Sequence, residues 1–271
     1  MQTPHTATAI LLAAFGSRLP DASSALERMR ERAGALYPDC RVETALTSGT
    51  VRRHKGAASR HGRSPEDILK ALRKEGVTRL AVQSLHVIPG DEFRSLERLV
   101  ETMRAGPGHP GGFEQIELGR PLLGNREDIR RVAQTILTVL PRDRAPGEAV
   151  LLMGHGTRGK ANGVYLDLAD ELRTLDPLVL IGALEAEPGL STKVDELRSL
   201  SAGRVHLMPL LFARGVHATR DMAGEGRNSW QAGLTRAGFT CVSHVKGAGE
   251  HEALAEIWLD HLQEAFARLG A

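Results

Sequence analysis

The chain of 271 residues contains one motif twice, and this repeat restricts its possible folds more than any other feature. Residues 10–18 align without a gap on residues 150–158, and both segments end in glycine, then serine or threonine, then arginine. Later in each half, residues 80–90 align on residues 205–215, and a glycine precedes each of these segments. Internal similarity of this kind is typical of a duplicated folding unit. We therefore predict two similar halves.

Apolar runs and amphipathic segments alternate along both halves. Residues 9–15 form a continuous apolar run, which is typical of a strand that is buried on both faces. Leu26, Met29 and Ala33 then recur at helical spacing. Strands that alternate with helices indicate βαβ units and a parallel sheet. The predicted fold class is therefore α/β, with two similar doubly wound parallel-sheet halves and a cleft between them.

The boundary between the halves is predicted from composition. Residues 141–148 contain two prolines, two arginines and a glycine, which is typical of a linker. We therefore expect an N-terminal half over residues 1–140, a linker over 141–148, and a C-terminal half over 149–271.

A polar loop is predicted after the second apolar run, and it carries Arg52 and Arg53. A helix is predicted to follow it, because Ser64 is a suitable N-cap and Pro65 suits the first helical position.

Charge and cysteine content exclude several classes of protein. Lys and Arg number 35 against 33 Asp and Glu, so the chain lacks the basic excess of a dedicated nucleic-acid binder. Cys40 and Cys241 lie far apart, so neither a disulfide framework nor a thiolate metal site is expected. The first apolar run is too short to span a bilayer, and no basic segment or cleavage box precedes it. We expect a soluble, cytoplasmic protein that has neither a nucleic-acid nor a membrane partner.

Three side chains that can bind a metal or accept a proton follow three successive predicted strands of the second half. These are His155, Glu185 and His217. Ligands of open α/β sheets bind beyond the carboxyl ends of the strands, so the three should meet at one rim. Two imidazoles and a carboxylate suit Co²⁺, Ni²⁺, Fe²⁺ or Zn²⁺, and three protein ligands leave coordination positions open. The same groups are suitable general bases near neutral pH.

Other interpretations of these residues stay open. A histidine after a strand is often a loop residue that makes a backbone hydrogen bond. The Gly-His-Gly sequence around His155 also suits a tight turn or a phosphate-binding loop, although the spacing of known phosphate-binding motifs is missing. Glu187 competes with Glu185 as the carboxylate. The turn signal Pro188-Gly189 leaves Glu185 nearer the strand end.

The first half has a corresponding rim with different side chains. In the repeat alignment, Phe15 replaces His155 and Glu92 replaces His217. We therefore expect this half to keep the fold without the metal ligands. Phe15, Arg52 and Arg53 are candidates for contact with an extended organic substrate. Core packing for Phe15, and a solvated loop for the two arginines, are the alternatives.

These residues occur in motifs that resemble a known family. The segments are 15–17, 82–93, 154–157, 182–188 and, most specifically, 209–224. The chain resembles the anaerobic sirohydrochlorin cobaltochelatases of the CbiK type, within the class II chelatases that include ferrochelatases. The resemblance covers almost the whole chain. It implies a chelatase-like fold and insertion of Co²⁺ into sirohydrochlorin, an early step of the anaerobic cobalamin route.

The resemblance also implies roles for individual residues. His155, Glu185 and His217 would hold the metal in the cleft, and His155 and Glu185 would act in catalysis. For the substrate, we predict contacts with Phe15, Ser17, Arg52, Arg53 and Glu92.

The implied partners follow from the same reaction. Sirohydrochlorin is an octacarboxylate, so an arginine-rich rim is expected for its binding. Co²⁺ is the expected substrate metal, with Fe²⁺ or Ni²⁺ as alternatives in its place. No nucleotide is expected, because no ATP-binding motif is present, and a homo-oligomer stays open. The rival functions are a sirohydrochlorin ferrochelatase, which makes sirohaem, and a metal or tetrapyrrole carrier without turnover.

Overall fold

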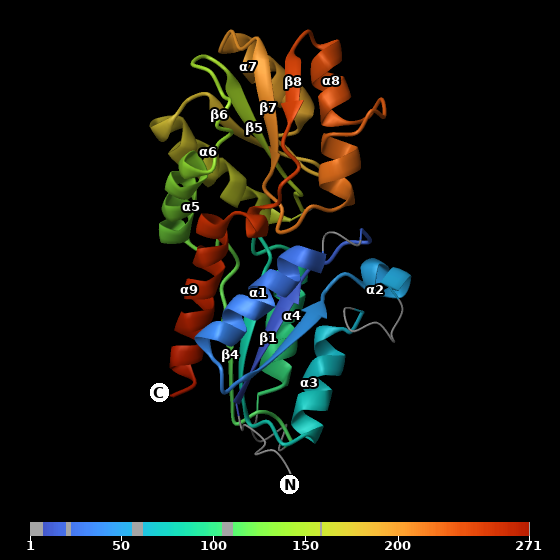
Figure 1. The fold of residues 1–271 in the computed structure, drawn as a ribbon, viewed down its shortest axis with the longest axis vertical. Coiled ribbons are helices and arrows are strands. Elements are labelled where there is room, and N and C mark those ends of the chain that lie inside the picture. Colours follow the sequence, from blue (N-terminus) through green and yellow to red (C-terminus); the bar gives the residue numbers. More distant parts are fainter. Residues whose placement is uncertain (1–7, 20–22, 56–61, 105–110, 158, 271) are drawn as a thin grey trace. The chain divides into compact units, whose positions relative to one another are not determined.

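The computed structural model describes residues 8–19, 23–55, 62–104, 111–157 and 159–270. Arg158, the last residue of the second repeat, lies outside the described residues. Strands and helices alternate along the chain (Figure 1). The strands are β1 (Thr8–Ala14), β2 (Arg41–Leu46), β3 (Arg79–Ser84), β4 (Gln115–Gly119), β5 (Ala149–Gly154), β6 (Val179–Ala183), β7 (Arg204–Pro209) and β8 (Thr240–Ser243). The α-helices are α1 (Ser23–Leu36), α2 (Gly49–Lys55), α3 (Pro65–Lys74), α4 (Asp91–Thr102), α5 (Arg126–Thr138), α6 (Gly163–Leu175), α7 (Leu190–Ser199), α8 (Trp230–Arg236) and α9 (Glu252–Arg268). Short 3₁₀ turns cover Lys160–Asn162 (η2) and Ala248–Glu250 (η4), and a π-helix covers His217–Met222 (η3).

The strands form two parallel sheets of the same topology. Their orders are β2-β1-β3-β4 and β6-β5-β7-β8. In the first sheet Ile10 pairs with Val42 on one side and Ala81 on the other. In the second sheet Leu152 pairs with Ile181 and Met208. The predicted α/β fold with two similar parallel sheets is confirmed.

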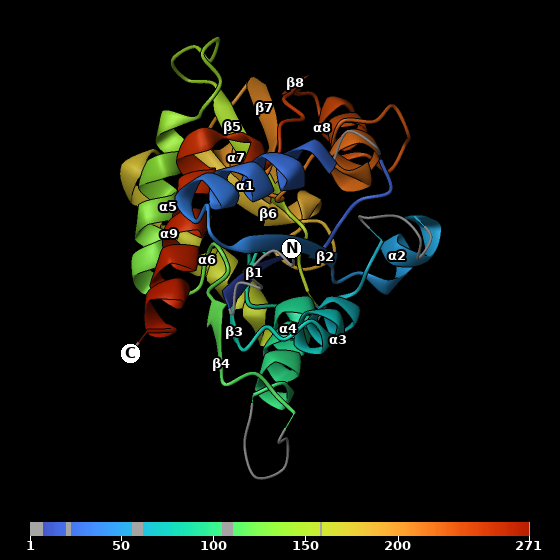
Figure 2. The ribbon, with the colours of Figure 1, turned by 60° about the horizontal axis from the view of Figure 1, so that its bottom comes forward.

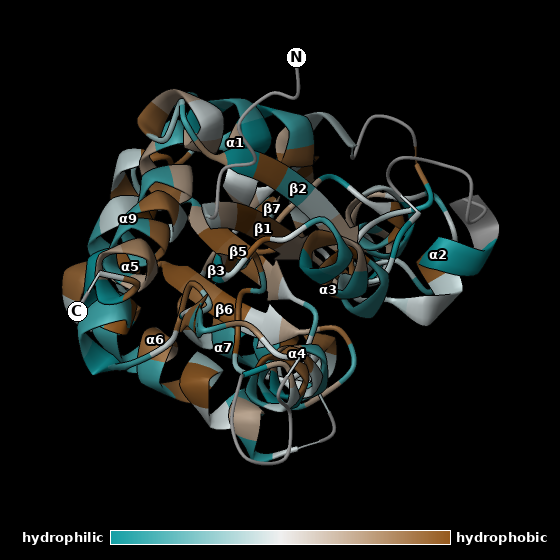
Figure 3. Cartoon of the chain, turned by 90° about the horizontal axis from the view of Figure 1, so that it is seen from below, coloured by the Kyte–Doolittle hydropathy of each residue, from teal (hydrophilic) through white to brown (hydrophobic). Residues whose placement is uncertain are grey.

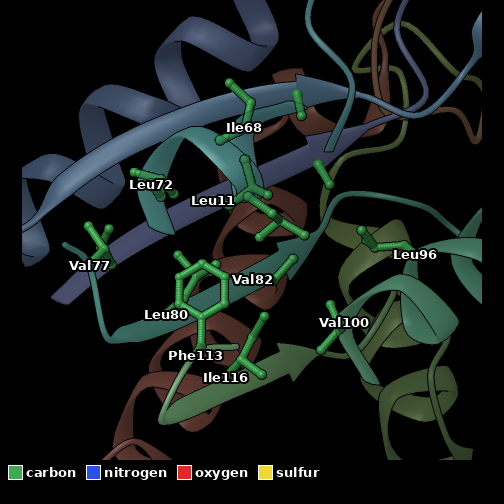
Figure 4. Packing of buried hydrophobic residues seen from close by; sticks show 14 residues of the cluster. Leu11, Ile68, Leu72, Val77, Leu80, Val82, Leu96, Val100, Phe113 and Ile116 are labelled. Carbon is green, nitrogen blue, oxygen red and sulfur yellow. The ribbon is translucent and has the colours of Figure 1, made fainter. Parts of the chain in front are cut away.

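The first sheet is covered by helices on both faces. Alternate residues of β1, such as Leu11, pack with apolar side chains of α3 and α4 in one core (Figure 4). The intervening residues, such as Ile10, point to the other face, where α1 and α9 lie (Figure 2). The continuous apolar run in this strand follows from burial on both sides. Hydropathy colouring shows the same arrangement, with brown strands among helices that carry teal outer surfaces (Figure 3).

The second sheet follows the same plan. Leu151, Val205 and Leu207 point to one face, where they pack with side chains of α7 and α8, including Trp230. On the other face α6 packs along β6, and α5 packs along α6. No helix among the described residues is long and apolar enough to cross a membrane.

The two compact units differ in extent from the halves expected from the sequence. One unit comprises Met1–Leu122 with Glu256–Ala271, and the other comprises Leu123–Ala255. The helix α5 belongs to the second unit because it packs against α6, and Arg130 lies 3.7 Å from Glu171 there. The expected linker, residues 141–148, is an irregular segment within the second unit.

The C-terminal helix α9 is held on the first unit by hydrogen bonds and an ion pair. The indole Nε1 of Trp258 donates to the carbonyl of His86 at 3.2 Å. Arg268 donates to the carbonyl of Leu118 at 3.0 Å and to the carboxylate of Glu117 at 2.9 Å.

Candidate functional site

Backbone hydrogen bonds at the end of β5 place Glu185 beside His155. The amide of Leu184 donates to the carbonyl of Gly154, and the amide of Glu185 donates to the carbonyl of His155, each at 2.9 Å. On the other side of β5, the amide of Leu210 donates to the carbonyl of Met153 at 2.9 Å. The residues that directly follow the three neighbouring strands therefore lie at one rim of the sheet, as the sequence predicts.

His155 lies between the other two predicted site residues. Its Nε2 is 3.2 Å from Nε2 of His217 and 4.0 Å from Oε1 of Glu185. Both imidazoles are half-buried, and the carboxylate of Glu185 is exposed. The structure thus brings together the three residues that the sequence singles out. The group is accessible to solvent on the side of the Glu185 carboxylate.

Hydrogen bonds to the other ring nitrogens fix the tautomers of both imidazoles. Nδ1 of His155 lies 3.0 Å from the carbonyl of Gly156, and Nδ1 of His217 lies 2.7 Å from Oδ2 of Asp221. Both partners are acceptors, so both Nδ1 atoms carry the hydrogen. In the neutral rings the two Nε2 lone pairs then face each other, an arrangement that a shared proton or a metal cation stabilises.

Asp221 is a site residue that sequence reasoning missed. It lies on the π-helix η3 one turn after His217, and its carboxylate orients the imidazole. The spacing of four residues between His217 and Asp221 is a usable signal, because residues four apart share one face of a helix. A π-helical turn is frequent at functional sites.

Tyr165 is a second residue that the sequence analysis missed. It lies on α6 and is fully buried, and its ring packs so closely on Gly154 that a Cβ there would lie 2.5 Å from the ring. Burial raises the pKa of Tyr165 to about 12, while hydrogen bonds from the backbone of Gly156 and His155 act in the opposite direction. The neutral hydroxyl therefore supports the backbone of the turn that carries His155.

The turn itself requires glycine. Gly156 has φ +85°, which residues with a side chain rarely adopt, and a Cβ would lie 3.1 Å from the backbone nitrogen of Ala186. Gly16, at the matching position of the first unit, has φ +92°. The repeated glycine therefore has a conformational reason in both units.

Glu187 has a structural partner of its own. Its Oε2 accepts hydrogen bonds from the amide of Gly189 at 2.8 Å and from the hydroxyl of Thr192 at 3.0 Å. These hydrogen bonds hold the pKa of Glu187 below its usual value. Glu187 is thus bound to residues at the start of α7, which leaves Glu185 as the carboxylate beside His155.

The first unit has the same backbone register at its rim. The amides of Thr47 and Ser48 donate to the carbonyls of Ala14 and Phe15, at 2.8 and 3.2 Å. By this register Ser48 corresponds to Glu185, and Phe15 corresponds to His155. Phe15 and Ser17 are half-buried. The Ser17 hydroxyl accepts from the amide of Leu19 at 3.2 Å.

The first unit also places a histidine and an acid near this rim. Glu92 lies half-buried in the first turn of α4. His86 follows β3, where Nδ1 lies 2.8 Å from the hydroxyl of Ser84 and Nε2 lies 3.0 Å from that of Thr47. Burial lowers the pKa of His86 to about 4, so this imidazole is neutral near pH 7. Both ring nitrogens of His86 are therefore engaged by hydroxyl groups.

The prediction of a loop at Arg52 and Arg53 is wrong, because both lie on the short helix α2. Nη1 of Arg52 donates to the carbonyls of Leu46 and Thr47, both at 2.7 Å. These contacts fasten α2 to the end of β2 and account for a helix in so polar a segment. Arg53 is exposed, and its Nη2 donates to the hydroxyl of Thr50 at 3.2 Å. Of the two, Arg53 keeps its guanidinium accessible to an anion.

Comparison with known proteins gives consistent matches. The model of the family "Cobalt chelatase (CbiK)" matches residues 8–267. The sirohydrochlorin cobaltochelatase CbiKC of Nitratidesulfovibrio vulgaris is 41% identical over 269 residues, which cover 98% of this chain and 93% of that protein. The sirohydrochlorin cobaltochelatase of Salmonella typhimurium is 32% identical over 262 residues, 95% of this chain and 96% of that protein.

A solved structure shares the fold at lower sequence identity. SirB from Bacillus subtilis, determined with Fe³⁺, superposes with a TM-score of 0.63 at 17% identity and covers 96% of each chain. This likeness supports the chelatase-like fold. The family match over residues 8–267 and the 41% identity to CbiKC show that the chain belongs to the cobalt chelatase (CbiK) family.

Proposed function

We propose that this chain inserts Co²⁺ into sirohydrochlorin without ATP and so forms cobalt-sirohydrochlorin for anaerobic cobalamin synthesis. One observation carries the proposal: 41% identity over 98% of the chain to a relative of that named activity. The grouping of His155, Glu185 and His217 at one rim supports it. Co²⁺ and sirohydrochlorin are the two substrates, and Fe²⁺ and Ni²⁺ are the competing metals.

The rim offers the two functions that metallation requires. Insertion removes two N–H protons from the macrocycle while a divalent ion is handed over. We propose that Nε2 of His155 and His217, with the carboxylate of Glu185, hold the ion, because all three groups bind it only when deprotonated. Asp221 would keep Nε2 of His217 available by holding the hydrogen on Nδ1. Glu185, which is exposed, and His155 would accept the released protons.

Side chains of the first unit are proposed to contact the macrocycle. Phe15 provides an aromatic ring where the second unit has His155, and Ser17 keeps the hydroxyl of the matching Thr157. Arg53 offers an accessible guanidinium for a substrate carboxylate. Glu92 is proposed at the same rim. We also propose a cytoplasmic location, which the free thiols of Cys40 and Cys241 support.

Anaerobic incubation with sirohydrochlorin and Co²⁺, Fe²⁺ or Ni²⁺, followed by absorption spectroscopy, tests the function. We expect many turnovers per chain, fastest with Co²⁺, and loss of most turnover in His155→Ala. Lys160→Ala, at an exposed residue of the same connection, is the matched control and should retain activity. Faster insertion of Fe²⁺ would favour the ferrochelatase. A single equivalent of bound product without turnover would favour the carrier.

A further inference from the structure

A second group of histidines lies in the second unit, apart from the rim described above. Asp143, His206 and His244 each offer one ligand atom, and these atoms lie within 4.8 Å of one another. Nδ1 of His206 is 3.0 Å from Nε2 of His244, and the two rings are stacked at 20°. His206 pairs in register with Val150, near the start of β5, whereas His155 follows the end of that strand.

A carboxylate fixes the tautomer of the buried imidazole in this cluster. His206 is fully buried, and its Nε2 lies 2.8 Å from Oε2 of Glu148. The carboxylate accepts, so Nε2 of His206 carries the hydrogen and the lone pair of Nδ1 is directed at His244. Glu148 is itself held by the amide of Ala145 at 2.9 Å, and Arg204 lies 3.6 Å from its other oxygen.

The same pattern occurs at the rim, where Asp221 holds Nδ1 of His217 and Nε2 faces a second imidazole. In both places a carboxylate orients one imidazole, and a second imidazole nitrogen lies about 3 Å from the opposite ring atom. Metal-binding histidines typically donate their other N–H to such a carboxylate.

We propose that Asp143, His206 and His244 form a second binding site for a divalent first-row transition ion, with Glu148 orienting His206. Two imidazoles and a carboxylate suit Zn²⁺, Co²⁺ and Ni²⁺. Nitrogen atoms at metal distances of about 2.0–2.1 Å lie roughly 3.3 Å apart in a tetrahedral site, close to the observed separation. Asp143 is exposed and His244 is half-buried, so an ion reaches the cluster from solvent.

Electrostatics at His244 favour its ligand form. Burial, followed by the neighbouring His206, lowers the pKa of His244, whereas Asp143 acts in the opposite direction. A neutral imidazole binds metal without first releasing a proton.

A bound ion would join three separate segments of the chain. Asp143 lies in the irregular segment before β5, His206 lies on β7, and His244 directly follows β8. Binding to the folded form only would raise the stability of the second unit with ion concentration. This site does not depend on the proposed function, because none of its residues belongs to the rim.

The test starts from untagged His155→Ala/His217→Ala protein, in which the rim cannot bind an ion through its histidines. Equilibrium dialysis against Zn²⁺ or Co²⁺, with elemental analysis, should give one tightly bound ion per chain. Adding His244→Ala should abolish this binding. Glu148→Gln should weaken it roughly 10–100-fold, as expected for loss of an orienting carboxylate. Asp195→Asn is the matched control, because this exposed acid lies on α7, which packs against the other face of the sheet.

Asp143→Asn provides an independent check, because it changes an exposed residue and leaves the buried imidazole in place. It should weaken binding at least tenfold, and Zn²⁺ should raise the melting temperature of the parent protein more than that of this variant. Equal binding by the parent, the His244→Ala variant and the Asp143→Asn variant would overturn the proposal. Absence of a tightly bound ion in the parent would also overturn it and would leave Glu148, His206 and His244 as a hydrogen-bonded chain.

Discussion

Each histidine at the rim of the second unit has one ring nitrogen engaged by an acceptor, and this determines the chemistry of the other. A backbone carbonyl holds Nδ1 of His155, and Asp221 holds Nδ1 of His217. The sequence indicates the histidines because each follows an apolar strand. It does not indicate the tautomers, which depend on a turn carbonyl and on a π-helix.

At this scale we predict different effects for two neighbouring acids. Glu185→Gln should lower cobalt insertion by about a hundredfold, because the variant loses both a charged ligand and a proton acceptor. Glu187→Gln should leave insertion nearly unchanged and slightly weaken the start of α7, where Glu187 accepts from Gly189 and Thr192. Steady-state kinetics with sirohydrochlorin and Co²⁺, and thermal unfolding of both variants, check this. Equal losses of activity would contradict the assignment of Glu185.

A second prediction concerns His86 and acid stability. Its pKa is about 4 in the fold against an ordinary value of 6.5, so the unfolded chain binds more protons between these values. Stability should therefore decrease as pH falls from about 6.5 to about 4, by up to about 3 kcal/mol from this residue. Denaturant unfolding at several pH values should show a shallower pH dependence in His86→Asn. The same slope in both proteins would contradict the prediction.

Several elements can be predicted from local sequence signals. The apolar runs of β1 and β5 are buried strands, and Ser64 caps α3 by accepting from the amide of Asp67 at 3.1 Å. By contrast, α2 is stabilised by contacts of Arg52 with carbonyls at the end of β2. Such long-range contacts have no local pattern, which explains why a loop is predicted there.

At the scale of a single turn, we predict that Gly156→Ala destabilises the protein by about 1–3 kcal/mol. The turn would hold alanine in a left-handed backbone conformation that residues with a side chain rarely adopt. It should also lower activity, because His155 precedes the turn. Gly159→Ala is the matched control, since a Cβ there meets no atom within 4 Å. Denaturant unfolding and insertion assays of both variants check this. A loss in Gly159→Ala as large as that in Gly156→Ala would contradict it.

A further prediction concerns α9. Trp258→Ala should destabilise the first unit by about 3–5 kcal/mol, because the indole is fully buried and donates to the carbonyl of His86. Leu166→Ala, at a 55% exposed position on α6, should change stability by less than about 0.5 kcal/mol. Denaturant unfolding followed by circular dichroism compares them. A loss below 1 kcal/mol in Trp258→Ala would show that α9 packs elsewhere.

At the scale of the whole chain, the sequence predicts the duplication correctly but not the extents of the two units. The repeat shows which strands correspond, and the structure confirms the same strand order in both sheets. Local sequence does not specify the sheet against which α9 packs. Contacts of Trp258 and Arg268 with the first unit provide this information.

The charge of the whole chain leads to a prediction on substrate binding. Arginine supplies 29 of the 35 basic residues, and the expected substrate carries many carboxylates. Affinity for sirohydrochlorin should therefore fall as salt rises, because exposed charge pairs are screened within roughly 8–10 Å. Arg53→Ala should raise KM about two- to fivefold without changing kcat, as expected for one exposed ion pair. Kinetics at two salt concentrations check both effects. An unchanged KM in Arg53→Ala would show that Arg53 is a solvated residue that does not bind the substrate.

Main-chain amides, rather than side chains, place Ser48 beside Phe15 and Glu185 beside His155. Substitutions at these positions therefore leave the frame of either sheet intact. A tandem gene duplication with this property gives evolution two copies of one scaffold that can diverge independently. One copy can keep its inherited chemistry under selection, while the other acquires new side chains by ordinary mutation without passing through an unfolded ancestor.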